Sequence, residues 1–405
     1  MGGFNGTPFT RLQTWWKHMP EFTKWVARCE TMLEAGRPVN DILWYLGEGV
    51  GHKPSERSPF PEGYKYDYVN TDALLNRIVA KDGKFATPEG VTWKVLWVPE
   101  RRWLSAAVKA KLSHFAKCGS RVVYGSAADV VEGIKPDVTC EGDGPADWRK
   151  GERPVDWLHR RDATADWYFV AANGMDAYSG EVTFRAEGDV TVWDPVTGAC
   201  WAPDILHAET GSTTVKLDLA SAESVFVVFA RGSDKSVASP TGHAPRGSGA
   251  LAASIPLRDW TLSFPAGWGA PASLKLDELA SWTDLPIGEE GRHFSGTATY
   301  TTMFNGKAGV PLTLDLGEVE TVAEVFVNGR KARTLWAPPY RCEIGDLVKD
   351  GVNELRVDVT TTWFNRLAYD ARLPEKDRKT WTIAGPKKGT PPKPAGLLGP
   401  VKLTR

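Results

Sequence analysis

Residues 91–124, VTWKVLWVPERRWLSAAVKAKLSHFAKCGSRVVY, carry the local pattern that decides the fold class of the first part of the chain. The segment 91–98 is rich in β-branched and aromatic residues, which is typical of a strand. Residues 103–117 predict a helix that ends at Gly119, and residues 121–124 predict another strand. A strand, a helix and a strand with short connections predict an α/β layered unit with a mainly parallel sheet.

The same alternation extends toward the N-terminus. Pro20 fits the first position of a helix and Gly36 the position just after its end, with one apolar face between them. Residues 42–46 form a short apolar run that predicts a buried strand, and Thr71 is a candidate N-cap of a further helix. We therefore expect an open α/β layered domain of the flavodoxin-like type over residues 20–155.

The pattern changes from residue 160 onward. Short strand candidates separated by Gly, Asp and Ser turns predict a small β-sandwich over residues 160–231. Residues 232–255 are rich in Ser, Gly, Pro and Ala and predict a linker. Residues 256–405 are again all-β, with the hairpin signal Asn328-Gly329, and predict a jelly roll. The chain is thus expected to be multidomain, α/β plus all-β, with residues 1–19 as an irregular loop or the remnant of a preceding barrel domain.

Composition excludes several classes of function. The 405 residues include 49 Lys plus Arg and 50 Asp plus Glu, so the basic surplus that nucleic-acid binding needs is missing. No apolar run approaches the ~18–20 residues of a membrane span, and we expect no membrane partner. The five cysteines show no CxxC spacing, which argues against a zinc knuckle or a disulfide scaffold. The 18 tryptophans are a weak pointer to carbohydrate, because flat aromatic rings stack on sugar faces.

Motifs of self-contained active sites are missing from the sequence. It contains neither the G-x-S-x-G of serine hydrolases nor the H-E-x-x-H of zinc enzymes. Residues 47–51, GEGVG, follow a predicted strand, but His52-Lys53-Pro54 stand where a dinucleotide site needs a helix N-terminus. We predict no catalytic residue in this chain and no zinc site, and the sequence motifs leave open whether it holds another metal.

Two segments contain candidate sugar-contacting residues. Trp15 and Trp16 could form a stacking platform, or they could pack against Phe22 and Trp25 as a hydrophobic staple, which the pattern favours slightly.

The second segment, residues 63–70 (GYKYDYVN), holds Tyr66, Asp67 and Asn70, whose polar groups suit sugar hydroxyls. The alternative is a capping segment in which Asn70 or Thr71 begins the next helix, and both alternatives stay open. We expect all five residues, Trp15, Trp16, Tyr66, Asp67 and Asn70, to line one substrate-binding surface.

Several long segments resemble a known family. FNGTPFTRLQTWW, PEGYKYDYVNTDALL and HRRDATADWYFVAANG are similar to the region that follows the barrel in the α-L-rhamnosidase glycoside hydrolases of family 106. SWTDLP, HFSGTATYTTMF, WAPPYRCEIGDLVKDGVNELRVDVTTTWFNRLAYD and AGLLGPVKL resemble that family's last domain, a galactose-binding-like jelly roll shared with family 2 glycosidases. The resemblance covers nearly the whole chain.

The resemblance implies a function for the parent protein. Members of this family are multidomain enzymes with a catalytic (β/α)8 barrel that cleave α-L-rhamnosides with inversion and depend on calcium. Inversion needs a carboxylic acid and a carboxylate base, and these belong to the barrel. This chain then corresponds to the C-terminal portion, with a rhamnose-containing glycan and the upstream barrel as partners and no catalytic carboxylate of its own. Glu48, the only glutamate in a predicted strand-end loop, matches neither role.

Two other interpretations compete with a hydrolase fragment that is inactive in isolation. One is a non-catalytic carbohydrate-binding module, and the other is a fragment of a family 2-type β-glycosidase. The latter accounts for residues 290–405 but not for the TWW and YKYDYVN segments. The chain begins without a basic segment followed by an apolar one, so no signal peptide is expected, and a periplasmic or secreted parent enzyme is compatible with the resemblance.

Overall fold

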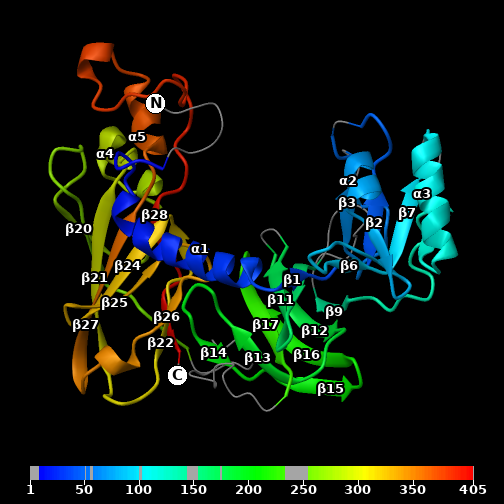
Figure 1. The fold of residues 1–405 in the computed structure, drawn as a ribbon. Coiled ribbons are helices and arrows are strands. Elements are labelled where there is room, and N and C mark those ends of the chain that lie inside the picture. Colours follow the sequence, from blue (N-terminus) through cyan, green and yellow to red (C-terminus); the bar gives the residue numbers. More distant parts are fainter. Residues whose placement is uncertain are drawn as a thin grey trace. The chain divides into compact units, whose positions relative to one another are not determined.

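The computed structural model describes residues 9–50, 52–54, 58–99, 103–143, 154–173, 176–232 and 254–404. The chain forms two compact units, shown as a ribbon in Figure 1. Met1–Val26 and Ser248–Arg405 make one, called the terminal unit here, and Ala27–Gly247 make the other, the central unit. Helix α1 (Met19–Glu34) contributes residues to both. The chain is mostly β-sheet with few helices and is multidomain, as predicted.

A four-stranded parallel sheet in the order β3-β2-β7-β8 forms the first part of the central unit. Its elements are β2 (Ile42–Tyr45), β3 (Tyr66–Val69), β7 (Val95–Pro99) and β8 (Arg121–Gly125), with helices α2 (Thr71–Asn76) and α3 (Ala106–Lys117). Strand β2 is buried on both faces: Ile42 and Trp44 belong to one apolar cluster, and Leu43 and Tyr45 to another. This two-sided burial explains the continuous apolar run in the sequence.

The predicted strand over residues 91–98 is divided in two. Thr92–Trp93 form β6, which joins β4 (Val79–Lys81) and β5 (Lys84–Ala86) in a three-stranded antiparallel sheet. The main-chain N–H groups of Lys94 and Val95 both donate to the carbonyl oxygen of Asp41, at 2.8 and 3.2 Å. The chain thereby leaves one sheet and enters the other at Lys94, an exchange that strand propensity does not encode.

Two antiparallel sheets form the rest of the central unit. One has the order β1-β10-β11-β17-β13-β14 and the other β15-β16-β12-β9. Their strands are β1 (Arg37–Pro38), β9 (Val138–Asp143), β10 (Val155–Arg161), β11 (Ala165–Ala172), β12 (Tyr178–Phe184), β13 (Asp189–Trp193), β14 (Cys200–Trp201), β15 (Ile205–Glu209), β16 (Ser212–Leu219) and β17 (Ser224–Ala230). Strands β1 and β9 come from the range 20–155, yet they pair with β10 and β12.

The terminal unit contains a six-stranded, a four-stranded and a two-stranded sheet, in the orders β20-β19-β21-β27-β24-β25, β18-β29-β22-β26 and β23-β28. Its strands are β18 (Ser254–Pro256), β19 (Trp260–Ser263), β20 (Ser273–Leu276), β21 (Thr297–Gly306), β22 (Thr313–Asp315), β23 (Glu318–Glu320), β24 (Val322–Val327), β25 (Arg330–Leu335), β26 (Arg341–Glu343), β27 (Gly351–Thr360), β28 (Gly396–Gly399) and β29 (Lys402–Thr404). Its short helices are η1 (Trp16–His18), η3 (Trp282–Asp284), α4 (Gly288–Arg292), η4 (Gly345–Leu347), α5 (Phe364–Asp370) and η5 (Glu375–Asp377).

The predicted hairpin at Asn328-Gly329 is confirmed. Strands β24 and β25 pair antiparallel on either side of it, and both turn residues have positive φ, 51° and 78°. A two-residue turn of this kind needs positive φ at both positions, which asparagine and glycine tolerate best.

The division predicted from the sequence into segments 1–19, 20–155, 160–231, 232–255 and 256–405 is finer than these two units and stays a prediction. Residues 233–253 of the predicted linker lie outside the described residues. None of the helices in the described ranges combines the length and the apolar character that crossing a bilayer requires.

Many of the tryptophans pack in the apolar cores. Within the described ranges, seven tryptophans are buried: Trp44, Trp93, Trp97, Trp157, Trp167, Trp260 and Trp282. In the terminal unit, the Trp282 indole N–H donates to the Tyr300 hydroxyl at 2.6 Å, and the Leu397 main-chain N–H donates to the same oxygen at 3.1 Å. The Tyr300 hydroxyl thus connects β21 to η3 and β28 inside the core.

Replacing Tyr300 by phenylalanine removes the acceptor of both donors. Each buried donor left without a partner costs about 1–3 kcal/mol, so we expect Tyr300→Phe to lower the free energy of unfolding by about 2–4 kcal/mol. Urea unfolding followed by tryptophan fluorescence measures the difference. Tyr124→Phe, at a residue that is 57% exposed, is the matched control. A loss no larger than that of the control contradicts the role given to Tyr300.

Candidate functional site

Tyr66 lies in an aromatic cluster on one face of the parallel sheet. Its ring centroid is 5.2 Å from that of Trp44, 5.4 Å from that of Phe60 and 5.3 Å from that of Tyr68. The tyrosines at 66 and 68 therefore pack over β2, because alternate residues of a strand face the same side. Tyr66 thus packs against other aromatic side chains as a core residue does, although its own side chain is partly exposed.

Asp67 faces the other side of the sheet. Its Oδ2 accepts hydrogen bonds from Asn40 Nδ2 at 2.9 Å and from the Trp93 indole N–H at 2.8 Å. Asp67 belongs to strand β3 and not to a turn that enters helix α2, so it points away from Tyr66. The expectation that Tyr66 and Asp67 share one surface is wrong, because neighbouring residues of a strand alternate between its faces.

Asn70 is the N-cap of α2. Its side-chain oxygen accepts a hydrogen bond from the Ala73 N–H at 2.8 Å, with extended backbone angles of −85° and 174°. The Thr71 hydroxyl, in the first helical position, lies 2.9 Å from that of Tyr45. Asn70 thus acts as a helix cap, which is the second of the two alternatives considered for this segment.

Trp15 and Trp16 belong to the terminal unit. The ring of Trp15 meets Phe9 edge-on at 5.7 Å, and Phe9 stacks on Phe22 at 6.0 Å. Phe22 in turn contacts Trp25 and Trp336, at 5.6 and 5.3 Å. Trp15 therefore joins an aromatic cluster at the start of α1, as the staple alternative predicts. Trp16 is 41% exposed.

The segment that holds these tryptophans is attached to the terminal unit by polar contacts. The Thr14 hydroxyl donates to the Thr361 carbonyl at 2.5 Å, and the Trp363 indole N–H donates to the Leu12 carbonyl at 2.7 Å. His18 Nε2 lies 3.1 Å from the Thr360 hydroxyl. Burial lowers the pKa of His18 to about 4, although Glu324 nearby opposes this shift. His18 is therefore neutral around pH 7.

The five predicted site residues thus divide between the two units: Trp15 and Trp16 lie in the terminal unit, and Tyr66, Asp67 and Asn70 in the central unit. Their role in sugar binding stays a prediction.

A hollow next to Asp67 was not predicted. We call it the Asp41 hollow. It has a volume of about 90 Å³ and is lined by Val39, Asn40, Asp41, Lys84, Thr92, Trp93, Lys94, Arg161 and Arg185. Asn40 and Trp93, the two residues that donate to Asp67, form part of its wall.

Asp41 is the buried anion of this hollow. Its side chain is 3% exposed, and its two oxygens accept from the two terminal nitrogens of Arg185, each at 3.0 Å. Lys94 Nζ lies 2.8 Å from Asp41 Oδ1. Arg185 also lies 3.4 Å from Asp137, and although burial lowers its pKa, Asp137 and Asp41 raise it by more. Asp41 is thereby neutralised on both oxygens.

Asp137, which lies beside Arg185, also binds a buried histidine, His159, that sits between two carboxylates. His159 Nδ1 is 2.8 Å from Asp137, and Nε2 is 2.8 Å from Asp166. Burial by itself lowers the pKa of His159, but the two carboxylates raise it above its usual value. Because ionised carboxylates only accept hydrogen bonds, both ring nitrogens donate and the ring is an imidazolium. Asp166 also accepts from Arg161 and Arg231, and these bonds outweigh burial and lower the pKa of its carboxyl group.

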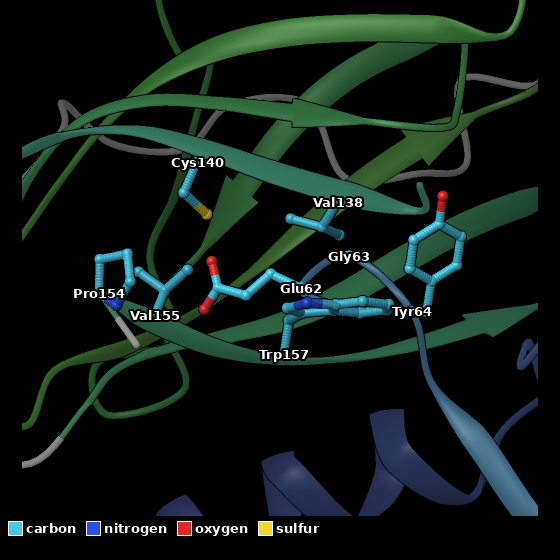
Figure 2. Close-up of a pocket in the computed structure, with 8 residues that line it drawn as sticks. All are labelled: Glu62, Gly63, Tyr64, Val138, Cys140, Pro154, Val155 and Trp157. Atoms are coloured by element: carbon cyan, nitrogen blue, oxygen red, sulfur yellow. The ribbon is translucent and has the colours of Figure 1, made fainter. Parts of the chain in front are cut away.

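A smaller cavity lies where β9 and β10 meet the loop before β3 (Figure 2). Its volume of about 20 Å³ has room for one water molecule but not for a sugar. Glu62 and Cys140 both point into it, beside the indole of Trp157. Burial, and secondarily the charge of Glu62, raise the pKa of Cys140 to about 12. The thiol is therefore protonated at neutral pH and is not an activated nucleophile.

The terminal unit has its own buried ion cluster. Arg366 in α5 is 1% exposed, and its terminal nitrogens lie 2.7 Å from Glu290 and 2.8 Å from Asp370. The guanidinium group lies over the ring of Trp268 at 5.3 Å. Hydrogen bonds from Arg366 and Lys379 lower the pKa of Glu290. The charges of these groups balance one another, and their ion pairs attach α5 to the rest of the terminal unit.

Neither a catalytic glutamate nor a metal centre is assigned. Glu48 accepts a hydrogen bond from the Ser105 N–H at 3.1 Å, at the start of α3. Among the described residues, no three His, Cys, Asp or Glu side chains form a group that could hold a metal ion. Calcium takes 6–8 oxygen ligands, and the calcium dependence that the resemblance implies stays a prediction.

Comparison with known proteins agrees with the sequence segments. A family model described as alpha-L-rhamnosidase matches residues 1–131. The structure of a rhamnosidase from Novosphingobium sp. PP1Y superposes with a TM-score of 0.81 at 28% identity, covering 98% of this chain and 42% of that chain. The chain resembles the α-L-rhamnosidases. The resemblance predicted from the sequence is thus confirmed.

A protein of Formosa agariphila that carries the name "Putative beta-glucuronidase" is 28% identical over 263 residues, which are 56% of this chain and 22% of that protein. The chain thus spans less than half of the length of either protein: 42% of the Novosphingobium rhamnosidase and 22% of the Formosa protein.

The Asp67 contacts give a stability prediction. Asp67→Ala leaves the Trp93 indole N–H and the Asn40 amide without their acceptor, in a partly buried position. We expect a loss of about 1–3 kcal/mol in the free energy of unfolding, measured by urea unfolding. Asp129→Ala, at an exposed carboxylate, serves as the control. Equal stabilities of the two variants contradict the structural role of Asp67.

His159 gives a pH prediction. Because its folded pKa is raised above the unfolded value near 6.5, its stabilisation is fully present below pH 6.5 and is lost as pH rises through the folded pKa. NMR titration of the imidazole resonances is expected to show His159 charged above pH 6.5. A His159 midpoint below 6.5, the usual value for an unperturbed imidazole, overturns this assignment.

Proposed function

We propose that this chain is the C-terminal portion of a glycoside hydrolase that acts on α-L-rhamnosides. In this proposal it supplies accessory and carbohydrate-contacting domains to a catalytic (β/α)8 barrel upstream. The observation that carries the proposal is the coverage of the Novosphingobium rhamnosidase: nearly all of this chain superposes on it, but less than half of that enzyme is accounted for.

The chemistry of inversion supports this division of labour. An inverting glycosidase needs an acid and a base about 6.5–9.5 Å apart on opposite sides of the sugar. Two of the glutamates named above have structural partners: Glu48 meets the start of α3, and Glu290 is paired with Arg366 and Lys379. We therefore place both catalytic carboxylates on the barrel, and we infer that the calcium of the family is held outside the described residues.

The domain types are part of the same proposal. We infer that the parallel sheet with α2 and α3 is an open α/β layered domain of the flavodoxin-like type, followed by a β-sandwich. The terminal unit is inferred to be a galactose-binding-like jelly roll, supported by its two larger antiparallel sheets around one apolar core. Among the predicted sugar-contacting residues, Trp16 keeps the exposure that stacking on a rhamnose-containing glycan requires.

Expression of the chain with and without a catalytic barrel tests the proposal. We expect the purified chain alone to show no turnover of an aryl α-L-rhamnoside, because it lacks the acid–base pair that supplies most of the rate enhancement. We expect activity when the chain is produced together with the barrel encoded upstream in the same gene.

Two results contradict this proposal. The first is turnover by the chain alone that disappears in Glu48→Gln, which would place a catalytic carboxylate here. The second is full activity of the barrel without this chain, together with binding of rhamnosides by the chain. That pair of results favours a non-catalytic carbohydrate-binding module.

A further inference from the structure

The Asp41 hollow has an unbalanced set of charges. Four of its lining side chains are cationic, Lys84, Lys94, Arg161 and Arg185, and one is anionic, Asp41. Arg185 and Lys94 both bind Asp41, and Arg161 binds Asp166, which is 3% exposed. Lys84 is exposed, and its ammonium group has no hydrogen bond or ion pair within the described part of the chain. Asp67, which accepts from Asn40 and Trp93 of the wall, is a second carboxylate beside the hollow. Four cationic residues thus face two carboxylates, and the hollow keeps a positive surplus.

The carboxylates that pair with Lys94 and Arg161 are buried in the protein interior. Asp41 and Asp166 are each 3% exposed, whereas the side chains of Lys94 and Arg161 are 40% and 46% exposed. Lys94 and Arg161 are therefore partly open to solvent, and Lys84 lines the same hollow. Thr92 and Asn40 add a hydroxyl and an amide to the same wall. This combination of charged donors with neutral polar groups is suited to an oxyanion.

The size of the hollow limits what enters it. Its volume of about 90 Å³ is smaller than the roughly 150 Å³ of an engineered cavity that accepts benzene. The hollow therefore has room for a carboxylate-sized group, while a six-membered ring stays at its mouth.

We propose that the Asp41 hollow binds the carboxylate of an acidic sugar residue, with Lys84, Lys94 and Arg161 as its charged donors. The choice of a sugar as the carrier of the carboxylate rests on the proposed function, whereas the test below uses binding to this chain without any hydrolysis. The two proposals can therefore fail separately.

The experiment uses pairs of sugars that differ at one carbon. Glucuronate and galacturonate are titrated into the full chain by NMR or calorimetry, with glucose and galactose as neutral counterparts. We expect the two uronates to bind, their affinity to fall with increasing salt, and the neutral sugars to bind at least tenfold more weakly. Charge-assisted hydrogen bonds to an anion are screened by ions and are lost with the carboxylate.

Variants identify the hollow as the site. Lys84→Gln removes the unpaired ammonium group and is expected to weaken uronate binding about tenfold, the effect of one charged hydrogen bond. Lys109→Gln, at an exposed lysine of α3, is the matched control and is expected to change nothing. Arg161→Gln is a second variant, with circular dichroism as a check on folding because Arg161 also contacts Asp166.

Three results overturn the proposal. One is no binding of either uronate, and another is equal binding of a uronate and its neutral counterpart. The third is uronate binding that Lys84→Gln leaves unchanged. Inorganic sulfate is titrated as an additional probe. If sulfate binds in a Lys84-dependent way while the uronates do not, the hollow is an inorganic anion site and the acidic sugar is excluded.

Discussion

A continuous series of charged contacts runs through the central unit from the parallel sheet into the two antiparallel sheets. Asp41, just before β2, binds Arg185, which follows β12, and Arg185 lies beside Asp137, which precedes β9. Asp137 then binds His159 on β10, and His159 binds Asp166 on β11. Some of these groups have a second partner, such as Lys94 for Asp41 and Arg161 for Asp166. Removing one member of a buried ion pair still leaves its partner short of compensation, at a cost of several kcal/mol. The attachment of the parallel sheet to the antiparallel sheets depends on this series.

The same series creates the surface chemistry of the Asp41 hollow. Carboxylates at its buried end require cations around them, and the cations extend to the surface at Lys94 and Arg161. The interior charges therefore fix where positive groups gather outside. Lys94 and Arg161 serve both the stability of the fold and the proposed anion binding. Lys84 lies outside the series of ion pairs, so its substitution tests anion binding without disturbing the fold.

Local signals in the sequence predicted much of the secondary structure. The glycine after α1, the candidate cap at Thr71 and the turn at Asn328-Gly329 act over a few residues, and each element formed near its expected place. The candidate site was harder to predict because its partners are far apart in the chain: Asp41 and Arg185 are separated by 144 residues. Periodicity also could not show that Tyr66 and Asp67 belong to a strand, which turns them to opposite faces. The charged residues of the hollow had no motif that would have identified them.

The attachment of the segment before α1 has a consequence for the order of events during synthesis. Thr14 hydrogen-bonds to Thr361, which the ribosome adds 347 residues later. At elongation rates of roughly 5–20 residues per second, that interval is on the order of tens of seconds. During this time the aromatic side chains of Phe9, Trp15 and Phe22 lack Trp336 and the strands that later cover them. The terminal unit therefore completes its folding only after translation has passed the central unit, and its first segment is the part most exposed to chaperones and proteases while it waits.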